Sequence, residues 1–193
     1  MRLISVAMLS GAAAVLVAVG AFAATSKPVE IRDAKADVTG VLDLQRGSLR
    51  RASDGRLRAS VTLAGKLDPK AMLAKSGPPG SVCLKVWTDA GADPAAARPD
   101  RLVCVTARSD GDLRASVFEE TARGLPRRLG AASVTLNKSA RSLVLRVSQS
   151  ALGRPELMRF AIESTLPGCE RVSCVDEVPD KGAVRRFRLR GSA

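Results

Sequence analysis

The sequence predicts an all-β protein: a single two-sheet antiparallel β-sandwich of about eight strands, preceded by a signal-peptide helix. Three observations support this fold class. Short runs in which apolar and polar residues alternate recur along the chain, which is the pattern of half-buried strands. Clusters of Gly, Asp, Ser and Pro separate these runs. No amphipathic run of helical length follows the N-terminal apolar segment.

Residues 1–23 have the composition of a secretory signal peptide. Arg2 supplies the positive start, an Ala/Val/Leu-rich run follows, and Ala21-Phe22-Ala23 is a small-x-small cleavage site. The alternative is an uncleaved membrane anchor, because the run is uncharged and roughly 20 apolar residues can span a bilayer. Its Ala and Gly content disfavours membrane retention. We therefore expect cleavage, no stable membrane span, and a secreted or extracytoplasmic protein associated with the cell envelope.

Behind the signal we expect a polar lead-in at residues 24–36 and one β-sandwich domain at residues 37–191. The alternating runs, in chain order, are Val29–Ile31, Leu42–Leu44, Leu57–Leu63, Ser81–Trp87, Arg101–Ala107, Leu113–Val117, Val134–Leu136, Leu143–Val147, Met158–Ile162 and Phe187–Leu189. The first is a short edge strand inside the lead-in. In the others, apolar residues recur at every second position, which places them on one face of a sheet.

Turn chemistry explains where these runs end. Ala52–Gly55, Asp110–Asp112 and Asn137–Arg141 each precede a run. Two short helical turns are expected as well. Asp68–Leu73 has an acidic N-cap followed by Pro at the first helical position, and Ser148–Gly153 ends in the glycine that favours a helix C-terminus.

The four cysteines predict two disulfides in an exported protein. If Cys83 lies opposite Cys104 in a hairpin, Leu84 faces Val103 on the other side of the same hairpin. The apolar pattern thus favours the register that brings the two sulfurs within bonding reach, among the three connectivities that four cysteines allow.

Cys169 and Cys174 form the second predicted pair and close a short loop. A metal site would need four convergent ligands. A redox site would need Cys-x-x-Cys spacing and a following helix, neither of which is present. A disulfide is therefore the preferred interpretation of this pair as well.

Lys and Arg number 31 against 19 Asp and Glu, a formal net charge of +12. This balance favours polyanionic partners such as acidic wall polymers or anionic lipid head groups, although spread basic residues also form ordinary solvated faces. The residues predicted to contact a polyanion are Arg186, Arg188 and Arg190, with Arg56 and Arg58 on another strand. The expected partner is an anionic envelope polymer or another exported protein, and the chain is expected to be a monomer.

The residues that are absent exclude several function classes. The sequence has no His, so Ser-His-Asp or Cys-His catalysis and His-ligated zinc or haem are excluded. It has no Tyr, and only Trp87, Phe118, Phe160 and Phe187 are aromatic after the signal. A stacking platform for bases or sugars is therefore not expected, and neither is specific nucleic-acid binding. No catalytic residue is assigned, and the prediction is a noncatalytic protein.

Two acidic clusters lie at opposite ends of the chain: Asp33, Asp37 and Asp43, and Asp176, Glu177 and Asp180. Chain termini commonly lie close together, so the clusters could jointly supply oxygen ligands to Ca²⁺. The candidate calcium ligands are Asp37, Asp43, Asp176 and Asp180. The alternative is that these acids only cap turns, because no Asp-x-Asp-x-Asp-Gly loop is present. No other cofactor is expected.

Three segments carry a resemblance: Asp37–Leu44, the Val-Cys-Leu and Val-Cys-Val hairpin, and Cys174–Gly182. Together they resemble a group of exported, functionally uncharacterised β-sandwich proteins of high-GC Gram-positive bacteria. The expected architecture is also similar to DOMON-like and carbohydrate-binding-module sandwiches. Those families bind haem or sugars, but their haem-binding members use His and Met ligands and this chain has no His. The resemblance implies a fold and a compartment, and no active site.

The leading hypothesis is therefore a noncatalytic exported β-sandwich module, an envelope-associated binding or interaction protein. The alternative is a Ca²⁺-dependent carbohydrate-binding domain or hydrolase built on the acidic clusters. Whether residues 37–43 and 176–180 meet in space distinguishes these two hypotheses.

Overall fold

The computed structural model describes residues 26–33, 38, 40–88, 97–122, 124–137, 139, 141–169, 174–180 and 183–189. The predicted signal peptide at residues 1–23, Asp37 and Arg190 lie outside these ranges. Within them the chain is all-β and contains two short 3-10 turns, η1 (Pro69–Met72) and η2 (Ser150–Leu152). None of the helices in the described ranges is long and apolar enough to cross a membrane.

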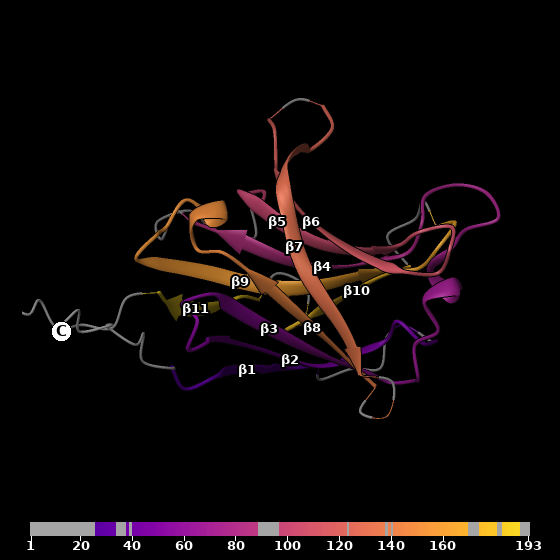
Figure 1. Ribbon diagram of the computed structural model, residues 1–193, viewed down its shortest axis with the longest axis horizontal. Coiled ribbons are helices and arrows are strands. Elements are labelled where there is room, and N and C mark those ends of the chain that lie inside the picture. Colours follow the sequence, from indigo (N-terminus) through magenta and orange to yellow (C-terminus); the bar gives the residue numbers. More distant parts are fainter. Residues whose placement is uncertain are drawn as a thin grey trace, which may run out of the picture.

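The strands of the described residues number eleven (Figure 1). They are β1 (Val29–Arg32), β2 (Leu44–Arg51), β3 (Leu57–Leu63), β4 (Ser81–Trp87), β5 (Arg101–Ala107), β6 (Leu113–Glu119), β7 (Arg127–Asn137), β8 (Ser142–Val147), β9 (Leu157–Thr165), β10 (Val175–Val178) and β11 (Arg185–Arg188). They form one antiparallel sheet in the order β1-β2-β3-β8-β7-β6-β5-β4-β9-β10, and β11 also pairs with β9.

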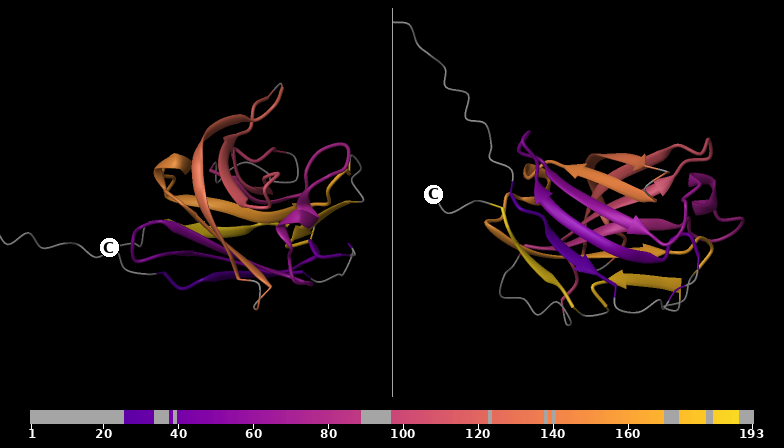
Figure 2. Two further views of the ribbon diagram at one scale, coloured as in Figure 1. Left: turned by 45° about the vertical axis from the view of Figure 1, so that its right-hand side comes forward. Right: turned by 90° about the horizontal axis from the view of Figure 1, so that it is seen from below.

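The sheet folds over at β7. Residues 127–132 of this long strand pair with β6, and residues 133–137 pair with β8. We call the part formed by β1, β2, β3, β8 and residues 133–137 half A, and the remainder half B. The two halves face each other across the core, and β7 crosses between them (Figures 1 and 2).

The open edges of the two halves come close together, because β10 in half B lies against β2 in half A. The result is a nearly closed, barrel-like shape. The predicted all-β antiparallel class is confirmed, but the prediction of two separate sheets with about eight strands differs from the structure. The difference has two causes: β7 is continuous through both halves, and β10 forms where only turn-capping acids or metal ligands were expected.

Alternation of side chains builds the core, as expected from the sequence. In β3 every second residue, from Leu57 to Leu63, is buried. The same holds for Leu143, Leu145 and Val147 in β8. The halves come into close contact at Gly47, where an added Cβ would clash with Ile162 of half B and would lie 2.8 Å from Cγ1 of Ile31 on the neighbouring strand β1. This close approach requires glycine at position 47.

Several local predictions are confirmed. The β4–β5 hairpin has Cys83 opposite Cys104 and Leu84 opposite Val103. At η1 the Asp68 side chain caps the turn by accepting the Lys70 N–H, and η2 ends at Gly153 with a φ of 80°. The edge strand expected in the lead-in is β1, which pairs with β2 and so is part of the sheet.

Candidate functional site

Three arginines lie side by side on the outer face of half A. Arg50 of β2 is the direct cross-strand partner of Arg58 of β3, and Arg58 is the partner of Arg146 of β8. Neighbouring strands lie about 4.8 Å apart, so the three Cα atoms span about 10 Å. Their sequence neighbours Leu57 and Leu145 face the core, which directs the arginines outward. We call Arg50, Arg58 and Arg146 the arginine row.

The arginine row is poorly neutralised. Among the described residues its one carboxylate neighbour is Asp54, whose Oδ2 lies 3.8 Å from Nη1 of Arg146. These two side chains are 43% and 44% exposed, and exposed pairs of this kind contribute little to stability. Like charges directly opposite each other in a sheet repel. The row is therefore a set of adjacent cations whose mutual repulsion a bound anion would relieve.

Small hydroxyl side chains separate the arginine row from further positive charge. Ser48 and Ser60 face each other in the next outward position along β2 and β3. Beyond them, Arg46 lies opposite Thr62 and also opposite Arg32 of β1. Two outward positions along a strand cover about 13 Å. The outer face of half A thus offers repeated cations, suited to a polymer with repeated anionic groups.

The C-terminal arginines predicted to contact a polyanion lie elsewhere. Arg186 and Arg188 are exposed on β11, which pairs with β9 in half B. Arg190 is outside the described residues. Of the other two predicted residues, Arg58 belongs to the arginine row, and Arg56 is exposed in the turn just before β3. The structure therefore brings one predicted residue together with two that were not predicted.

The sequence predicts that the arginines of the row face outward, but it does not predict that they lie side by side. Arg50 follows the buried Leu49, and Arg146 lies between the buried Leu145 and Val147, which marks both arginines as outward-facing. Their alignment depends on β3 pairing with β8, a strand some 80 positions later in the chain. Alternation alone does not specify which strands are neighbours.

The two acidic clusters meet in part. Carboxylate oxygens of Asp33, Asp43 and Asp176 lie within 4.8 Å of one another, close to where β10 approaches β2. Of the four candidate calcium ligands, Asp43 and Asp176 belong to this group and Asp180 does not. The fourth, Asp37, lies outside the described residues. Oxygen ligands of this kind suit Ca²⁺, which takes six to eight of them.

Asp176 also has a structural role at this seam. It is 1% exposed, and its Oδ2 accepts the backbone N–H of Leu44 at 2.6 Å. The opposite residue in β9, Ser164, donates its hydroxyl to the carbonyl of Leu42 at 2.7 Å. These two bonds fasten half B to the start of β2, where no strand ladder joins the halves.

Glu177, the next acid of β10, binds a lysine on the outer face of half B. Nζ of Lys85 lies 3.0 Å from Glu163 and 2.9 Å from Glu177. Burial lowers the pKa of Lys85, but its attraction to Glu163 and its hydrogen bond to Glu177 outweigh burial, so this pKa lies above its usual value. Lys85 is therefore already paired and adds little to an anion-binding surface.

Trp87 is buried on the same face of β4 as Lys85, outside the core cluster between the two halves, and offers no stacking surface. The residue is 3% exposed, and its Nε1 donates to the carbonyl of Ala97 at 2.9 Å. Nζ of Lys85 lies 5.6 Å from the ring centroid. With its ring covered, Trp87 is not available to stack on a ligand.

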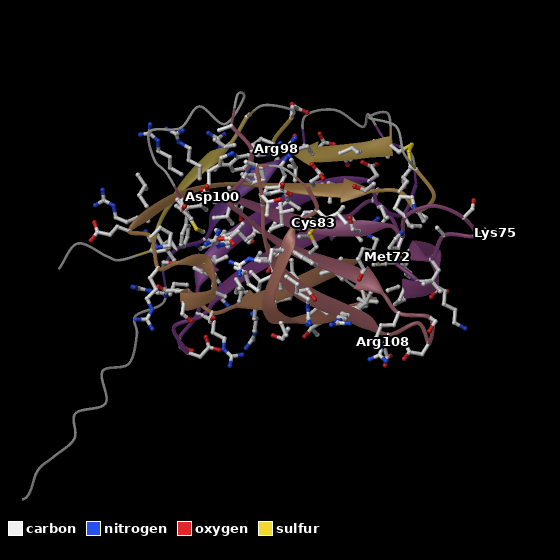
Figure 3. The ribbon with its side chains drawn as sticks, turned by 90° about the horizontal axis from the view of Figure 1, so that it is seen from above. Met72, Lys75, Cys83, Arg98, Asp100 and Arg108 are labelled. Carbon is white, nitrogen blue, oxygen red and sulfur yellow. A yellow bond between two sulfur atoms is a disulfide. The ribbon has the colours of Figure 1, made fainter. Side chains whose placement is uncertain are left out.

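Both predicted disulfides are present. Cys83 is bonded to Cys104 and Cys169 to Cys174, and no cysteine is free. In Figure 3 the labelled Cys83 lies in the middle part of the sheet, whereas Arg108 lies at its rim. Two disulfides in one small domain fit an extracellular or otherwise oxidising environment.

Comparison with known proteins gives no family. No protein-family model matches the chain, and no curated protein matches its sequence. The resemblance to exported sandwich proteins of high-GC Gram-positive bacteria accordingly stays a prediction. A function for this chain has to be argued from the geometry of its own residues.

Proposed function

We propose that the protein is a noncatalytic exported module that holds an anionic polymer of the cell envelope on the outer face of half A. The arginine row is the observation that supports this proposal. Three guanidinium groups on three adjacent strands are held by the sheet, so little ordering of the backbone is needed when an anion binds. Guanidinium groups match carboxylates and phosphates through pairs of parallel hydrogen bonds.

Export is part of the same proposal. The disulfides fit an oxidising compartment, and residues 1–23 have the sequence of a signal peptide. We also infer that the two facing halves act as a β-sandwich, the architecture that carbohydrate-binding modules use to present a flat outer face to a polymer. The lack of His and Tyr removes two of the side chains that commonly act in acid–base catalysis, which supports a binding role.

Two matched triple variants test the proposal. Arg50→Gln/Arg58→Gln/Arg146→Gln removes the arginine row, and Arg185→Gln/Arg186→Gln/Arg188→Gln removes the same charge from β11. Both would be measured for binding to immobilised polyglutamate and to isolated envelope fragments at one salt concentration. We expect the first variant to bind at least tenfold more weakly than the second. Equal losses would assign binding to net charge alone, and would refute a role for the row.

The Ca²⁺-dependent alternative has one supporting observation, the convergence of Asp33, Asp43 and Asp176. Against it, Asp176 already fastens the seam through the Leu44 N–H, a role that needs no ion. We therefore propose that the acidic group is chiefly structural.

A further inference from the structure

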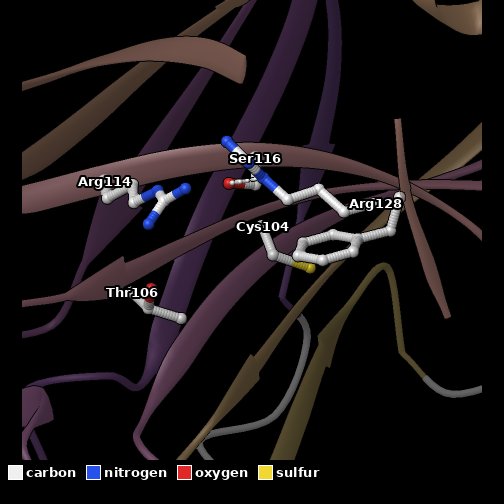
Figure 4. Close-up of a pocket in the computed structure, with 6 residues that line it drawn as sticks. Cys104, Thr106, Arg114, Ser116 and Arg128 are labelled. Atoms are coloured by element: carbon white, nitrogen blue, oxygen red, sulfur yellow. Dashed lines mark hydrogen bonds between the residues drawn. The ribbon is translucent and has the colours of Figure 1, made fainter. Parts of the chain in front are cut away.

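A small pocket lies on the outer face of half B. Its lining residues in β5 and β6 alternate with residues that face the core, so the pocket is on the opposite face of the sheet from the core. It has a volume of about 200 Å³ and is lined by Cys104 and Thr106 of β5, Arg114, Ser116 and Phe118 of β6, and Arg128 of β7 (Figure 4). These residues pair across the strands: Thr106 with Arg114, Cys104 with Ser116, and Phe118 with Arg128. The floor of the pocket is therefore rigid sheet, fixed further by the Cys83–Cys104 disulfide.

An irregularity in β7 turns Arg128 into the pocket. The β6–β7 register shifts between Val117, which pairs with Gly130, and Phe118, which pairs with Arg128, so Leu129 is the extra residue of a β-bulge. In an unbroken strand Arg128 would share the core side with Gly130, two residues on. The bulge instead places Arg128 beside Phe118 on the outer face. Bulges of this kind re-aim a single side chain.

The guanidinium of Arg128 is held in place on one side. Its Nε donates to Oγ of Ser116 at 3.3 Å, and Ser116 itself is 7% exposed. Arg114 extends toward Ser116 from the other side of the pocket (Figure 4). Two cations therefore converge on one buried hydroxyl.

No carboxylate neutralises these two arginines among the described residues. Arg114 and Arg128 take part in no ion pair there. Glu119 follows Phe118 directly and so points to the opposite face, where it binds Arg101 and Arg127. Asp110, in the turn before Arg114, lies 3.4 Å from Arg108. The pocket is thus a positively charged hollow in a part of the sheet without a counter-ion.

The volume limits what the pocket can hold. Typical ligand sites enclose about 300–1,000 Å³, so a pocket of about 200 Å³ admits one small group rather than a whole sugar chain. Hydroxyls of Ser116 and Thr106 supply polar partners beside the two cations, and Phe118 supplies an apolar wall. This combination suits an oxyanion attached to a short apolar or neutral stem.

We infer that this pocket, which we call the Arg114–Arg128 pocket, binds a single carboxylate or phosphate group of a small ligand or of a polymer end. The site lies on half B, whereas the proposed polymer surface lies on half A. It is therefore independent of the proposed function and can be present whether or not the arginine row binds a polymer.

Titration with inorganic phosphate and, separately, with propionate tests the inference, at constant ionic strength adjusted with sodium chloride. The amide resonances of residues 104–106 and 114–118 report binding in heteronuclear NMR spectra of the folded, disulfide-bonded protein. We expect millimolar binding of at least one of the two anions with shifts in these residues. The anion that binds more tightly identifies the ligand as phosphorylated or carboxylated.

Variants complete the test. Arg114→Gln/Arg128→Gln should weaken binding of that anion at least tenfold, while Arg108→Gln/Arg127→Gln, with the same loss of charge near the same hairpins, should change it less than twofold. The variant that lacks the arginine row should also bind the anion normally, which separates this site from the polymer surface. Absence of binding by both anions, or equal losses in the two double variants, would overturn the inference.

Discussion

The backbone N–H of Leu44 donates to the buried carboxylate of Asp176 at 2.6 Å, although the two residues are 132 positions apart in the sequence. Leu44 begins β2 in half A, and Asp176 lies in β10 of half B. This bond replaces the strand ladder that is missing between β2 and β10, and so helps to hold the two halves together.

Replacement of Asp176 tests this role. Asp176→Ala leaves the Leu44 N–H unpaired in the interior, and bonds to charged groups are worth about 1.5–3 kcal/mol, so we expect a loss of about 2 kcal/mol. Asp176→Asn retains an accepting oxygen and should lose less than half as much. Urea unfolding measures both values. Equal stability of Asp176→Ala and wild type would show that the bond does not hold the seam.

Calcium addition tests the rival role of the same acids. Because ligand binding to the native state alone raises the melting temperature, a calcium site formed by Asp33, Asp43 and Asp176 would give a rise at millimolar Ca²⁺. We expect no rise beyond that produced by the same concentration of Mg²⁺. A rise specific to Ca²⁺ that disappears in Asp33→Asn/Asp43→Asn would instead support the calcium-dependent alternative.

Gly47 should tolerate no side chain. In Gly47→Ala the new methyl group would clash with Ile162 of half B and would lie 2.8 Å from Cγ1 of Ile31 in β1, so the two halves would have to shift, at a cost of about 1–3 kcal/mol. Gly130→Ala is the matched control, because an added Cβ at Gly130 has no atom within 4 Å. Thermal unfolding should show a lower midpoint for the first variant and little change for the second. Similar midpoints would contradict the close approach at Gly47.

Lys85 should contribute to stability in a pH-dependent way. Its pKa is raised in the folded state, so its contribution is fully present below the unfolded pKa of about 10.5 and is lost as pH rises through the folded pKa. Between neutral pH and pH values above the folded pKa, wild type should therefore lose more stability than Lys85→Met. Lys70→Met, at an exposed site, should behave as wild type does. A parallel pH dependence in all three proteins would refute this contribution.

Local features of the fold were predictable because nearest neighbours in sequence or in a hairpin determine them. The alternation in β3 gave both its bounds and its buried face. The apolar neighbours of Cys83 and Cys104 indicated the β4–β5 register in which the two cysteines lie opposite each other and form the disulfide. In both cases the relevant contacts lie within one strand or one hairpin.

Long-range features were not predictable in the same way. β10 was missed because one of its two inward residues, Asp176, is polar, which leaves Val178 as the only inward apolar residue in a four-residue strand. The continuous path of β7 was missed because its first half is exposed and includes a bulge. The arginine row and the Arg114–Arg128 pocket depend on which strands become neighbours, and alternation does not specify that.

The salt dependence of polymer binding tests the central claim most directly. Each cation that binds an anionic site releases counter-ions, so the slope of log Kd against log salt counts the contacts. With polyglutamate as the polymer, we predict that Arg50→Gln/Arg58→Gln/Arg146→Gln lowers the magnitude of this slope by about 2, as expected for three lost contacts. Arg185→Gln/Arg186→Gln/Arg188→Gln should leave it within about 0.5 of the wild-type slope. Equal slopes for the two variants, or wild-type binding that is indifferent to salt, would contradict the assignment of the arginine row as the polymer-binding surface.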